Sequence, residues 1–466
     1  MLTRREMMGA AAAPLLAAAK GKPNIVLIVS DDHHWQCMGA AGNPNISTPN
    51  LDSLARRGVM FTDGVISTPQ CAPSRGILLS GQECYQHGLD SNRHTGFRSF
   101  NGATVVEQMR RGGYETNLVG KWHIDPTPKA CGFTSAPRWL KPASSDYIDP
   151  MLRHGLDATE DTKTPGHITD ILTQSAVDVI AKARQPYLLW LTYNAPHTPW
   201  TASERFAKMY AGRNAMLAPP AHPKPVPADP RALAAKKGGG KKGGKKGDGA
   251  GGSRADGVFD WETYYAVISE LDAGIGRVVE AVEKSGQWDN TLILFIGDNG
   301  YLCGSKGLNG KVFPWEESIR IPFIAAGGLV SRAGKSDAPV ASIDVPATML
   351  DYAGIRSSHK MTGSSIRSAI EGKKFARDAS FACWNDGAVE ALYAGYPVEP
   401  YRAARTSTAK YIVWESKKEA LFDLRSDRFE ERNLAADAAH TGMLKQMKEK
   451  MRRRMRETSD PAIAWL

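Results

Sequence analysis

Asn24-Ile-Val-Leu-Ile-Val-Ser30 is a continuous apolar run rich in β-branched residues, and it leads directly into Asp31-Asp32. A run without polar alternation is typical of a strand buried on both faces of a sheet. Later stretches resemble it and predict further strands, at Glu115–Gly120, Pro186–Tyr193, Thr291–Gly297 and Ile321–Ala326. Several of these end in polar residues, as the first one does.

Helical periodicity separates the strand candidates. It predicts helices over Asn50–Arg57, Thr104–Arg111, Ile168–Ala183 and Trp261–Ser285. Strands alternating with helices predict an α/β fold, a large and mainly parallel sheet sandwiched between helices. In such sheets the ligand crevice lies just beyond the carboxyl ends of the strands. The polar clusters occupy that position, so we expect the functional site there.

The composition is that of an ordinary soluble globular protein. The chain has 466 residues, 42% hydrophobic and 23% charged, which excludes a fibrous or wholly disordered protein. Lysines between Lys236 and Lys246 supply six of its ten net positive charges, so the folded body is only mildly basic and nucleic-acid binding is not required. The Lys/Gly-rich stretch 232–257 predicts a disordered insert, with polyanion binding as the alternative.

The first residues look like a targeting signal. Residues 1–19 combine Arg4-Arg5 with a short apolar, alanine-rich stretch, the form of an export signal and similar to a twin-arginine signal. An ordinary secretory signal is the alternative. Both predict an exported protein, periplasmic or extracellular, with no membrane-bound mature form, because no apolar run approaches the length of a spanning helix.

The pattern changes after the predicted catalytic domain, residues 20–357. Short strand candidates follow at Ala379–Trp384, Arg402–Thr406, Lys410–Trp414 and Ala420–Asp423, and a basic helix is predicted from about Ala438 to Glu457. Residues 358–466 are therefore expected to form a small α+β subdomain, an antiparallel sheet with one helix. Six cysteines in so long a chain make no disulfide framework, although one bridge remains possible.

The most specific motif is Cys71-Ala-Pro-Ser-Arg-Gly-Ile-Leu-Leu-Ser-Gly81. Pro73 suits the first turn of a helix and Gly81 its end. Cys71 then lies at the helix N-terminus, which favours an anion. Arg75 lies four residues on and returns to the same face. A nucleophile and a cation at an anion-binding helix start suit attack on a sulfate or phosphate ester. The alternative is a buried structural cysteine.

A metal site is predicted at the strand ends. Asp31, Asp32, Asp298 and Asn299 offer only oxygen ligands, and uncompensated buried carboxylates would be costly, so we expect a cation among them. Oxygen ligands favour calcium or magnesium over zinc. Calcium is preferred because its looser geometry admits a carboxamide and a substrate oxygen together. For any single Asp, a helix cap or turn is the alternative.

Cationic and titratable residues follow other strands. Lys121 and His123 follow one, His197 follows another, and Lys311 stands between Gly310 and Val312. Such residues are usually found on the surface. Beside a predicted metal cluster, they are better interpreted as a ring that binds sulfate or phosphate and supplies acid–base groups.

The ordered set of motifs resembles the formylglycine-dependent sulfatases of the alkaline phosphatase superfamily, over nearly the whole mature chain. The matching segments are D-D at 31–32, C-A-P-S-R-G-I-L-L-S-G at 71–81, G-K-W-H at 120–123, N-A-P-H at 194–197, G-D-N-G at 297–300 and G-K-V-F at 310–313. The resemblance implies an alkaline-phosphatase-like fold and sulfuric ester hydrolysis. It also implies that a maturation enzyme converts Cys71 to formylglycine, whose hydrate attacks sulfur and then expels sulfate by collapse to the aldehyde.

The resemblance implies a role for each matched residue. The calcium ligands would be Asp31, Asp32, modified Cys71, Asp298 and Asn299. Arg75 and His123 would hold and deprotonate the hydrate. Lys121 and Lys311 would bind the sulfate, and His197 would protonate the leaving oxygen. Ser144 and Ser145 are candidates for the serine that some members add near the hydrate.

Two other functions remain open. A phosphatase or phosphodiesterase of the same superfamily would keep the metal ligands, but such enzymes place Ser or Thr where this chain has Cys71. A non-catalytic sulfated-glycan binding protein would result if Cys71 were never converted. For the substrate we favour a carbohydrate or glycan sulfate over a small ester. Candidate substrate contacts, each equally compatible with a plain structural role, are His33, His34, Arg93, His94 and Tyr301.

Overall fold

The computed structural model describes residues 21–184, 186–220, 258–387 and 398–466. The predicted export signal and the Lys/Gly-rich insert lie outside the described residues. Among the described residues, none of the helices combines the length and the apolar character that crossing a membrane requires.

An eight-stranded sheet forms the centre of the molecule, with the strand order β10-β2-β9-β8-β1-β7-β3-β4. The strands span β1 (Asn24–Ser30), β2 (Val59–Phe61), β3 (Glu115–Lys121), β4 (Ser135–Leu140), β7 (Tyr187–Thr192), β8 (Thr291–Gly297), β9 (Phe323–Ala326) and β10 (Gly334–Ser336). Strand β9 runs antiparallel to β2 and β8, whereas the other pairings are parallel. The mainly parallel sheet is therefore confirmed.

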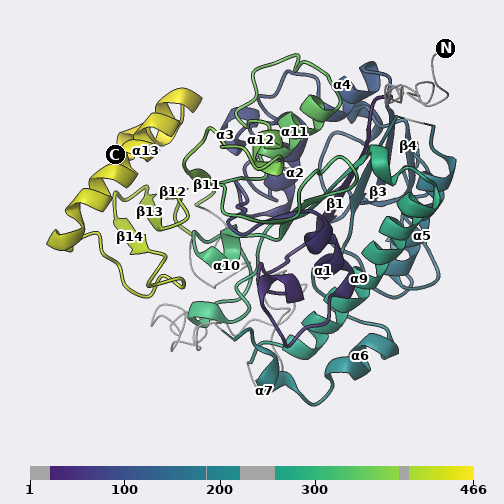
Figure 1. Cartoon of the computed structure of the whole chain (residues 1–466), viewed down its shortest axis with the longest axis horizontal. Helices are drawn as coiled ribbons and strands as arrows, with labels where there is room; N and C mark the ends of the chain where they lie inside the picture. The colour runs from purple at the N-terminus through teal and green to yellow at the C-terminus, as the bar shows by residue number, and fades with distance from the viewer. Residues whose placement is uncertain (1–20, 185, 221–257, 388–397) are drawn as a thin grey trace, which may run out of the picture.

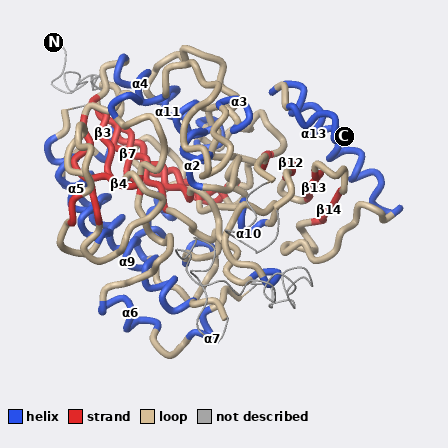
Figure 2. Tube along the Cα trace, turned by 180° about the vertical axis from the view of Figure 1, so that it is seen from behind, coloured by secondary structure: helices blue, strands red, loops and turns tan. Residues whose placement is uncertain are grey.

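Helices cover both faces of this sheet (Figures 1 and 2). On one face lie α1 (Pro49–Arg57), α5 (Ile168–Lys182) and α9 (Trp261–Lys284), and on the other lie α2 (Cys71–Ser80), α4 (Val105–Arg111) and α11 (Asp344–Tyr352). Shorter elements are α3 (Cys84–His87), α6 (Glu204–Tyr210), α7 (Asn214–Leu217), α10 (Glu316–Ile319), α12 (Arg367–Ile370), β5 (Met151–Leu152) and β6 (Thr162–Lys163).

The position of β1 in the middle of the sheet, between two layers of helices, explains the apolar run in its sequence. Ile25 and Leu27 join the hydrophobic cluster with α2, α4 and α11, whereas Val26 and Ile28 join the cluster with α1, α5 and α9. Every residue of β1 is buried. Because successive side chains point to opposite faces, a strand with helices on both sides has no solvent-facing position for a polar residue, and its interior residues 25–29 are all apolar.

The C-terminal part forms a second sheet beside the first (Figure 1). Its antiparallel strands, in the order β11-β12-β13-β14, span β11 (Ser380–Trp384), β12 (Tyr401–Arg405), β13 (Ala409–Trp414) and β14 (Glu419–Asp423). One face packs into the main hydrophobic cluster through residues such as Trp384 and Ile412. The other face, with Tyr411, packs under Met447 and Met451 of α13 (Thr441–Thr458). The predicted antiparallel sheet with one helix is confirmed.

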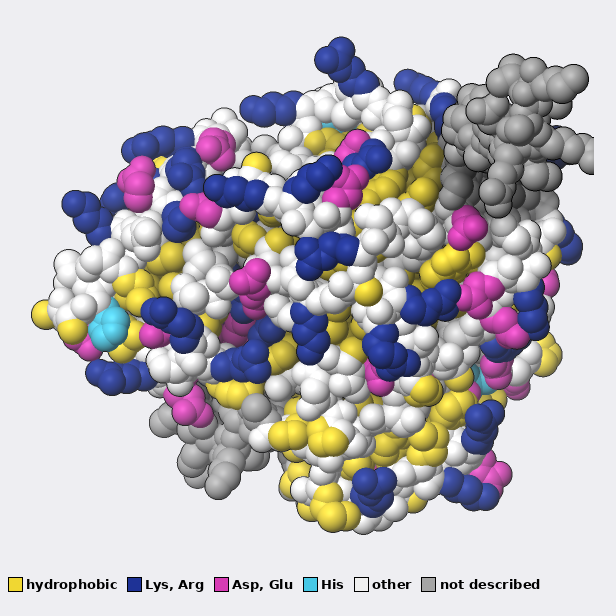
Figure 3. Space-filling view, viewed as in Figure 1, with side chains coloured by type: hydrophobic (Ala, Val, Ile, Leu, Met, Phe, Trp, Pro, Cys, Tyr) yellow, Lys and Arg dark blue, Asp and Glu magenta, His cyan; other side chains and the backbone are white. Residues whose placement is uncertain are grey.

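Charged side chains are dispersed over the visible face of the molecule. Figure 3 shows Lys and Arg side chains interspersed with Asp and Glu side chains rather than gathered in one basic area. Mixed charge of this kind is usual for a globular surface and does not form the continuous basic stripe expected of a nucleic-acid-binding face.

Candidate active site

Two neighbouring strands bring four oxygen-bearing side chains to one edge of the sheet. Asp31 and Asp32 follow β1, and Asp298 and Asn299 follow β8, whose Gly297 pairs in register with Ser30. All four side chains are buried. The backbone N–H of Asp32 donates to Asp298 Oδ1 at 3.4 Å. The carboxyl ends of parallel strands therefore meet here, as predicted.

The backbone at Asp32 turns to bring its carboxylate to Asn299. Asp32 has a φ of 58°, a conformation that residues with a Cβ rarely adopt outside turns and functional sites. Asn299 Nδ2 donates to Asp32 Oδ1 at 2.6 Å and to the carbonyl of Gly300 at 2.8 Å. With both amide hydrogens used, the carboxamide oxygen is left to face Cys71, 3.8 Å from its Sγ.

Cys71 is the first residue of α2 and lies against the acidic cluster. Its Sγ is 3.3 Å from Asp31 Oδ1, and its side chain is fully buried. Helix α2 ends where the sequence predicts, since Gly81 has a φ of 67° and its N–H bonds the carbonyl of Ile77. At the other end, Ala72 N–H donates to Asn92 Oδ1 at 2.9 Å, so an asparagine from a distant loop caps the helix.

Three cationic side chains enter the same cluster. Arg75 donates to Asp298 Oδ2 at 2.8 Å. Lys121 Nζ pairs with Asp31 and lies 3.5 Å from Cys71 Sγ. Lys311 Nζ lies 2.9 Å from that sulfur and 2.5 Å from Asp32 Oδ1. These buried charges neutralise one another, which is the condition for burying charge at all.

The two predicted histidines differ in their placement. His197 is buried; its Nδ1 bonds the carbonyl of Thr198 at 2.6 Å, and its Nε2 faces Asp32 Oδ2 at 3.7 Å. His123 is 7% exposed and has a φ of 61°, and its Nδ1 has no hydrogen-bond partner among the described residues. Burial and the charge of Lys121 lower the pKa of both histidines.

The charges and burial around Asp31 and Asp298 shift the pKa values of these two carboxyl groups in opposite directions. Burial alone would raise the pKa of Asp31, but the charges of Lys121, His197 and Lys311 hold it far below its usual value. Burial, followed by the repulsion of Asp31, raises the pKa of Asp298 to about 7. Burial also raises the pKa of the Cys71 thiol, which disfavours its thiolate form.

The donor set fits a hard divalent cation. Asp31, Asp32, Cys71 and Asp298 each offer a ligand atom, and these atoms lie within 4.8 Å of one another. Three of these four donors are carboxylates, and the Asn299 oxygen adjoins them. His197 lies within the same reach of Asp31 and Cys71, but a predominance of oxygen donors suits calcium or magnesium better than zinc.

Gly120 lets β3 deliver Lys121 to the cluster. Its φ is +100°, and a Cβ there would lie 1.8 Å from the carbonyl oxygen of Thr192 on β7. We expect Gly120→Ala to lower the free energy of unfolding by at least about 2 kcal/mol, since it combines backbone strain with a backbone clash. Urea denaturation measures this effect.

The matched control for that variant is Gly113→Ala. Gly113 also has a positive φ, of +89°, but nothing lies within 4 Å of a Cβ placed there. It should suffer only the cost of the left-handed backbone, roughly 1 kcal/mol. Equal destabilisation in the two variants would mean that the approach of Thr192 does not constrain this strand end.

The five residues predicted as substrate contacts differ in their exposure to solvent. His33 is fully buried; its ring nitrogens bond Ser30 Oγ and the Cys37 carbonyl, a structural role, and burial lowers its pKa to about 4. His34 and Tyr301 are buried as well, at 0% and 1% exposure. Only Arg93 and His94 reach the surface, and Arg93 pairs with Asp386 at 3.4 Å.

Of the two serine candidates, Ser145 is linked by hydrogen bonds to the loop that carries His197. Its N–H donates to Asn194 Oδ1 at 3.3 Å, and the carbonyl of Asn194 accepts the N–H of His197. Tyr147, two residues on, donates its hydroxyl to the His197 carbonyl at 2.9 Å. Sequence reasoning missed the roles of Tyr147 and Asn92, because each acts through a loop remote in sequence from its partner.

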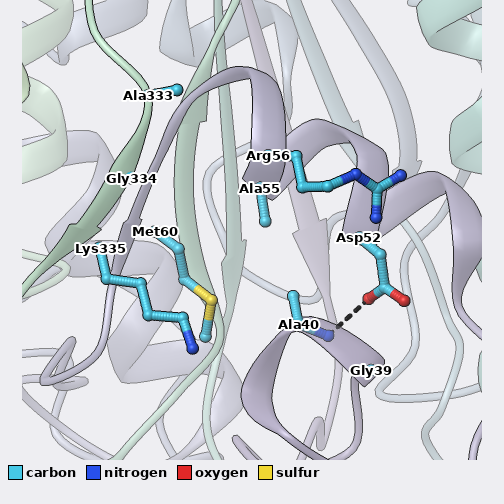
Figure 4. A pocket seen from close by; sticks show the side chains of 9 residues that line it. All are labelled: Gly39, Ala40, Asp52, Ala55, Arg56, Met60, Ala333, Gly334 and Lys335. Atoms are coloured by element: carbon cyan, nitrogen blue, oxygen red, sulfur yellow. Dashed lines mark hydrogen bonds between the residues drawn. The ribbon is translucent and has the colours of Figure 1, made fainter.

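A surface pocket of about 470 Å³ lies among other residues (Figure 4). It is formed by η1 (Gly39–Ala41), α1, β2 and β10, and Asp52 within it accepts the N–H of Ala40 at 2.6 Å. None of its lining residues is a predicted site residue. We therefore do not assign this pocket to the candidate active site, which is identified by its cluster of carboxylate, cysteine, lysine, arginine and histidine side chains.

Comparison with known protein families finds two matches. The profile described as "Sulfatase" matches residues 23–355, which include every predicted site residue. The profile described as "N-sulphoglucosamine sulphohydrolase, C-terminal" matches residues 304–457, which include the second sheet and most of α13.

Individual proteins are similar along most of the chain. An ulvan-active sulfatase from Formosa agariphila is 26% identical, over 94% of this chain and 82% of its own length. An N-acetylglucosamine-6-O-sulfatase from Bacteroides thetaiotaomicron is 24% identical, over 94% of this chain and 87% of its own length. A solved structure, described as a complex with its substrate D-glucosamine-2-N,6-O-disulfate, superposes with a TM-score of 0.80 at 23% identity, over 94% of this chain and 99% of that one.

Proposed function

Since the chain belongs to the sulfatase family, we propose that this sulfatase removes sulfate from a carbohydrate or glycan sulfate, using a formylglycine formed from Cys71 and a bound calcium ion. Its mainly parallel sheet between helices, with a small C-terminal antiparallel sheet, is the alkaline-phosphatase-like fold. The proposal extends the family assignment to the nucleophile, the ion and the substrate class.

One observation carries the proposal. Cys71 Sγ lies at the start of α2, between Asp31 Oδ1 at 3.3 Å and Lys311 Nζ at 2.9 Å. The side chain that would be oxidised at Cβ, with loss of its sulfur, thus adjoins both a cation-binding carboxylate and a positive group able to bind an ester oxygen. A purely structural cysteine would need neither neighbour.

The residues present would hold calcium through Asp31, Asp32, residue 71, Asp298 and Asn299. When bound, calcium would polarise a sulfate oxygen as a Lewis acid. The formylglycine hydrate would supply a hydroxyl nucleophile whose partner hydroxyl allows sulfate to be released. A formylglycine-generating maturation enzyme is the partner that this chemistry requires.

The positive groups of the chain bind and orient the sulfate. Lys121 and Lys311 Nζ both lie within 3.5 Å of Cys71 Sγ, where they can reach oxygens on a sulfur held beside that atom. Arg75 is one helical turn from Cys71 and is fixed by Asp298 and by the carbonyl of Lys121, at 2.6 Å. Fixed donors aimed at developing negative charge lower the barrier without reorganising.

The histidines move protons. The Nδ1 of His123, which has no hydrogen-bond partner among the described residues, would take a proton from the nucleophile. His197 keeps its Nδ1 on the carbonyl of Thr198, so its Nε2 is the nitrogen that exchanges a proton with the leaving oxygen. The depressed pKa of His197 reflects burial and neighbouring cations, and an anionic ester at this site would favour its protonated form.

A test of the histidine role compares two leaving groups. We expect His197→Ala to lower kcat/KM for a carbohydrate sulfate by about 10²–10⁴-fold, because a sugar alkoxide needs a proton to leave, but by less than about tenfold for an aryl sulfate with an acidic phenol. His440→Ala, at the start of α13, is the control and should change neither. Equal losses on both substrates would exclude proton donation by His197.

The substrate class rests on the relatives. Two similar proteins are described as acting on ulvan and on N-acetylglucosamine 6-O-sulfate groups, and export would bring the enzyme to such polymers. A sulfate-release assay on a panel of defined sulfated saccharides, beside the matched phosphate esters and choline sulfate, tests the class. Preferred release from saccharides supports the proposal, and faster phosphate release would favour a phosphatase.

We further propose the organisation that the sequence predicts. Residues 1–19 would direct export, residues 20–357 would form the catalytic domain, and residues 358–466 would form the C-terminal subdomain. The mature enzyme would be periplasmic or extracellular. Continuity of the hydrophobic cluster from Leu27 to Trp384 makes the two parts one packed unit.

A further inference from the structure

Two cysteines outside the proposed active site lie with their sulfurs adjacent. Cys84 begins α3 and Cys383 lies in β11, 299 residues apart in the chain, yet their Sγ atoms are 3.4 Å apart. Both side chains are buried, at 0% and 3% exposure. The sulfurs are thus in contact, and a disulfide would bring them to a bonding distance of about 2.0 Å.

Neighbouring groups hold both sulfurs in place. Asn385 Nδ2 donates to Cys84 Sγ at 3.3 Å, and Thr68 Oγ1 lies 3.4 Å from Cys383 Sγ. The N–H of Cys383 bonds the carbonyl of Ser67 at 2.8 Å. The cysteine of β11 is therefore attached to the loop that leads into Cys71 and α2.

Polar contacts on both sides of Cys84 join its segment to α13, which packs on the sheet that contains β11. Glu83 accepts from Arg454 of α13 at 2.6 Å, and the Tyr85 hydroxyl donates to Thr458 Oγ1 at 2.8 Å. These contacts flank Cys84 on both sides in sequence. The segment that carries Cys84 is thus held against the C-terminal part by contacts other than those of the thiol itself.

We propose that Cys84 and Cys383 form a disulfide once the protein reaches an oxidising compartment. The two thiols lose two protons and two electrons as the S–S bond forms. A protein or small-molecule disulfide is the oxidant, and its own S–S bond is cleaved to give two thiols by exchange through a mixed disulfide. The inference is independent of the proposed reaction and requires only export.

The bridge would attach the C-terminal sheet to the segment that follows the Cys71 helix, and the backbone hydrogen bond of Cys383 already attaches that sheet to the loop that precedes the helix. Cys84 is the fourth residue after Ser80, where α2 ends. The backbone N–H of Cys383 donates a hydrogen bond to the loop that precedes α2. Pairing these two cysteines also leaves Cys71 free for conversion, because the sulfur of Cys71 faces Asp31 and Lys311. A bridge that closes so long a loop is expected to stabilise the fold.

Peptide mapping of the full chain, secreted into an oxidising periplasm and alkylated in denaturant without reduction, tests the pairing. We expect a linked peptide pair that contains Cys84 and Cys383, with Cys131 alkylated as a free thiol. Alkylation of both Cys84 and Cys383, or linkage of either one to a different cysteine, would overturn the proposal.

A stability measurement separates a bridge from mere packing of the two side chains. Reduction should lower the melting temperature of the unsubstituted protein by about 5 °C. Cys84→Ser should remove this dependence on reductant, whereas Cys131→Ser, which alters another buried cysteine, should keep it. A reductant-dependent shift that persists in Cys84→Ser would contradict the inference.

Discussion

Cys71→Ser is expected to abolish turnover, with a loss of at least about 10⁴-fold in kcat for sulfate release. The substitution removes the cysteine side chain whose Cβ would be oxidised to the aldehyde of formylglycine. A serine hydroxyl could accept the sulfo group from the ester, but it has no second hydroxyl through which to expel sulfate. We therefore also expect a sulfated protein to accumulate, and intact-mass spectrometry after incubation with substrate would detect it.

Cys131→Ser provides the matched control for this variant. Cys131 is also fully buried, but it lies in the hydrophobic cluster near Phe133 and is not one of the cation-binding group. Its substitution should alter stability and leave kcat within about threefold of the unsubstituted enzyme. Near-normal hydrolysis by Cys71→Ser would show that another residue is the nucleophile.

Asp298→Ala is expected to remove the bound ion. The variant deletes one of the three clustered carboxylates and leaves Arg75, its partner at 2.8 Å, with Asp31 at 3.4 Å as its remaining carboxylate in this cluster. Losing a ligand should weaken calcium binding by more than the roughly 10–100-fold that follows loss of an outer partner. Calcium titration by calorimetry, with metal analysis after dialysis, measures this directly without relying on activity.

The control for that variant is Asp460→Ala. Asp460 is likewise a buried carboxylate paired with a buried arginine, Arg402, at 2.6 and 2.7 Å, but in the C-terminal part. Breaking this pair leaves an uncompensated charge and should lower stability by about 3–5 kcal/mol. Calcium affinity should stay unchanged. Normal calcium binding by Asp298→Ala would exclude Asp298 as a ligand.

The long buried strands were predictable because a continuous run of β-branched apolar residues is typical of a strand covered on both faces. Strands β1 and β8 have the boundaries expected from their apolar runs, since helices on both faces leave no place for polar residues. The short strands β2 and β10, with three residues each, carry no such signal. Strand β4 was missed because it has no continuous apolar run, is only partly buried and includes Pro137 and Arg138.

Helix boundaries agreed to within one to three residues. Helix α9 begins at Trp261 as expected and ends one residue before the predicted Ser285. The last helix, α13, begins at Thr441, after a short 3-10 turn over Ala438–His440, which the periodicity could not distinguish from a helix. Such differences do not affect the position of the site.

The site was predictable as a set of strand ends but not as a set of contacts. Topology requires that Asp31 and Asp298 meet, because β1 and β8 are parallel neighbours. No sequence rule places Asn92 at the start of α2 or Tyr147 on the carbonyl of His197. Likewise, six cysteines allowed one bridge in principle, and only the fold brings Cys84 and Cys383 together.

Mass spectrometry of the peptide carrying Cys71, from protein purified out of its native host and assayed for sulfate release, tests the central claim most directly. The account predicts an aldehyde or its hydrate at residue 71, in proportion to the activity of each fraction. An unmodified thiol in protein that releases no sulfate would instead favour a glycan-binding role. Full sulfate release from protein whose Cys71 is entirely unmodified would contradict the proposed chemistry.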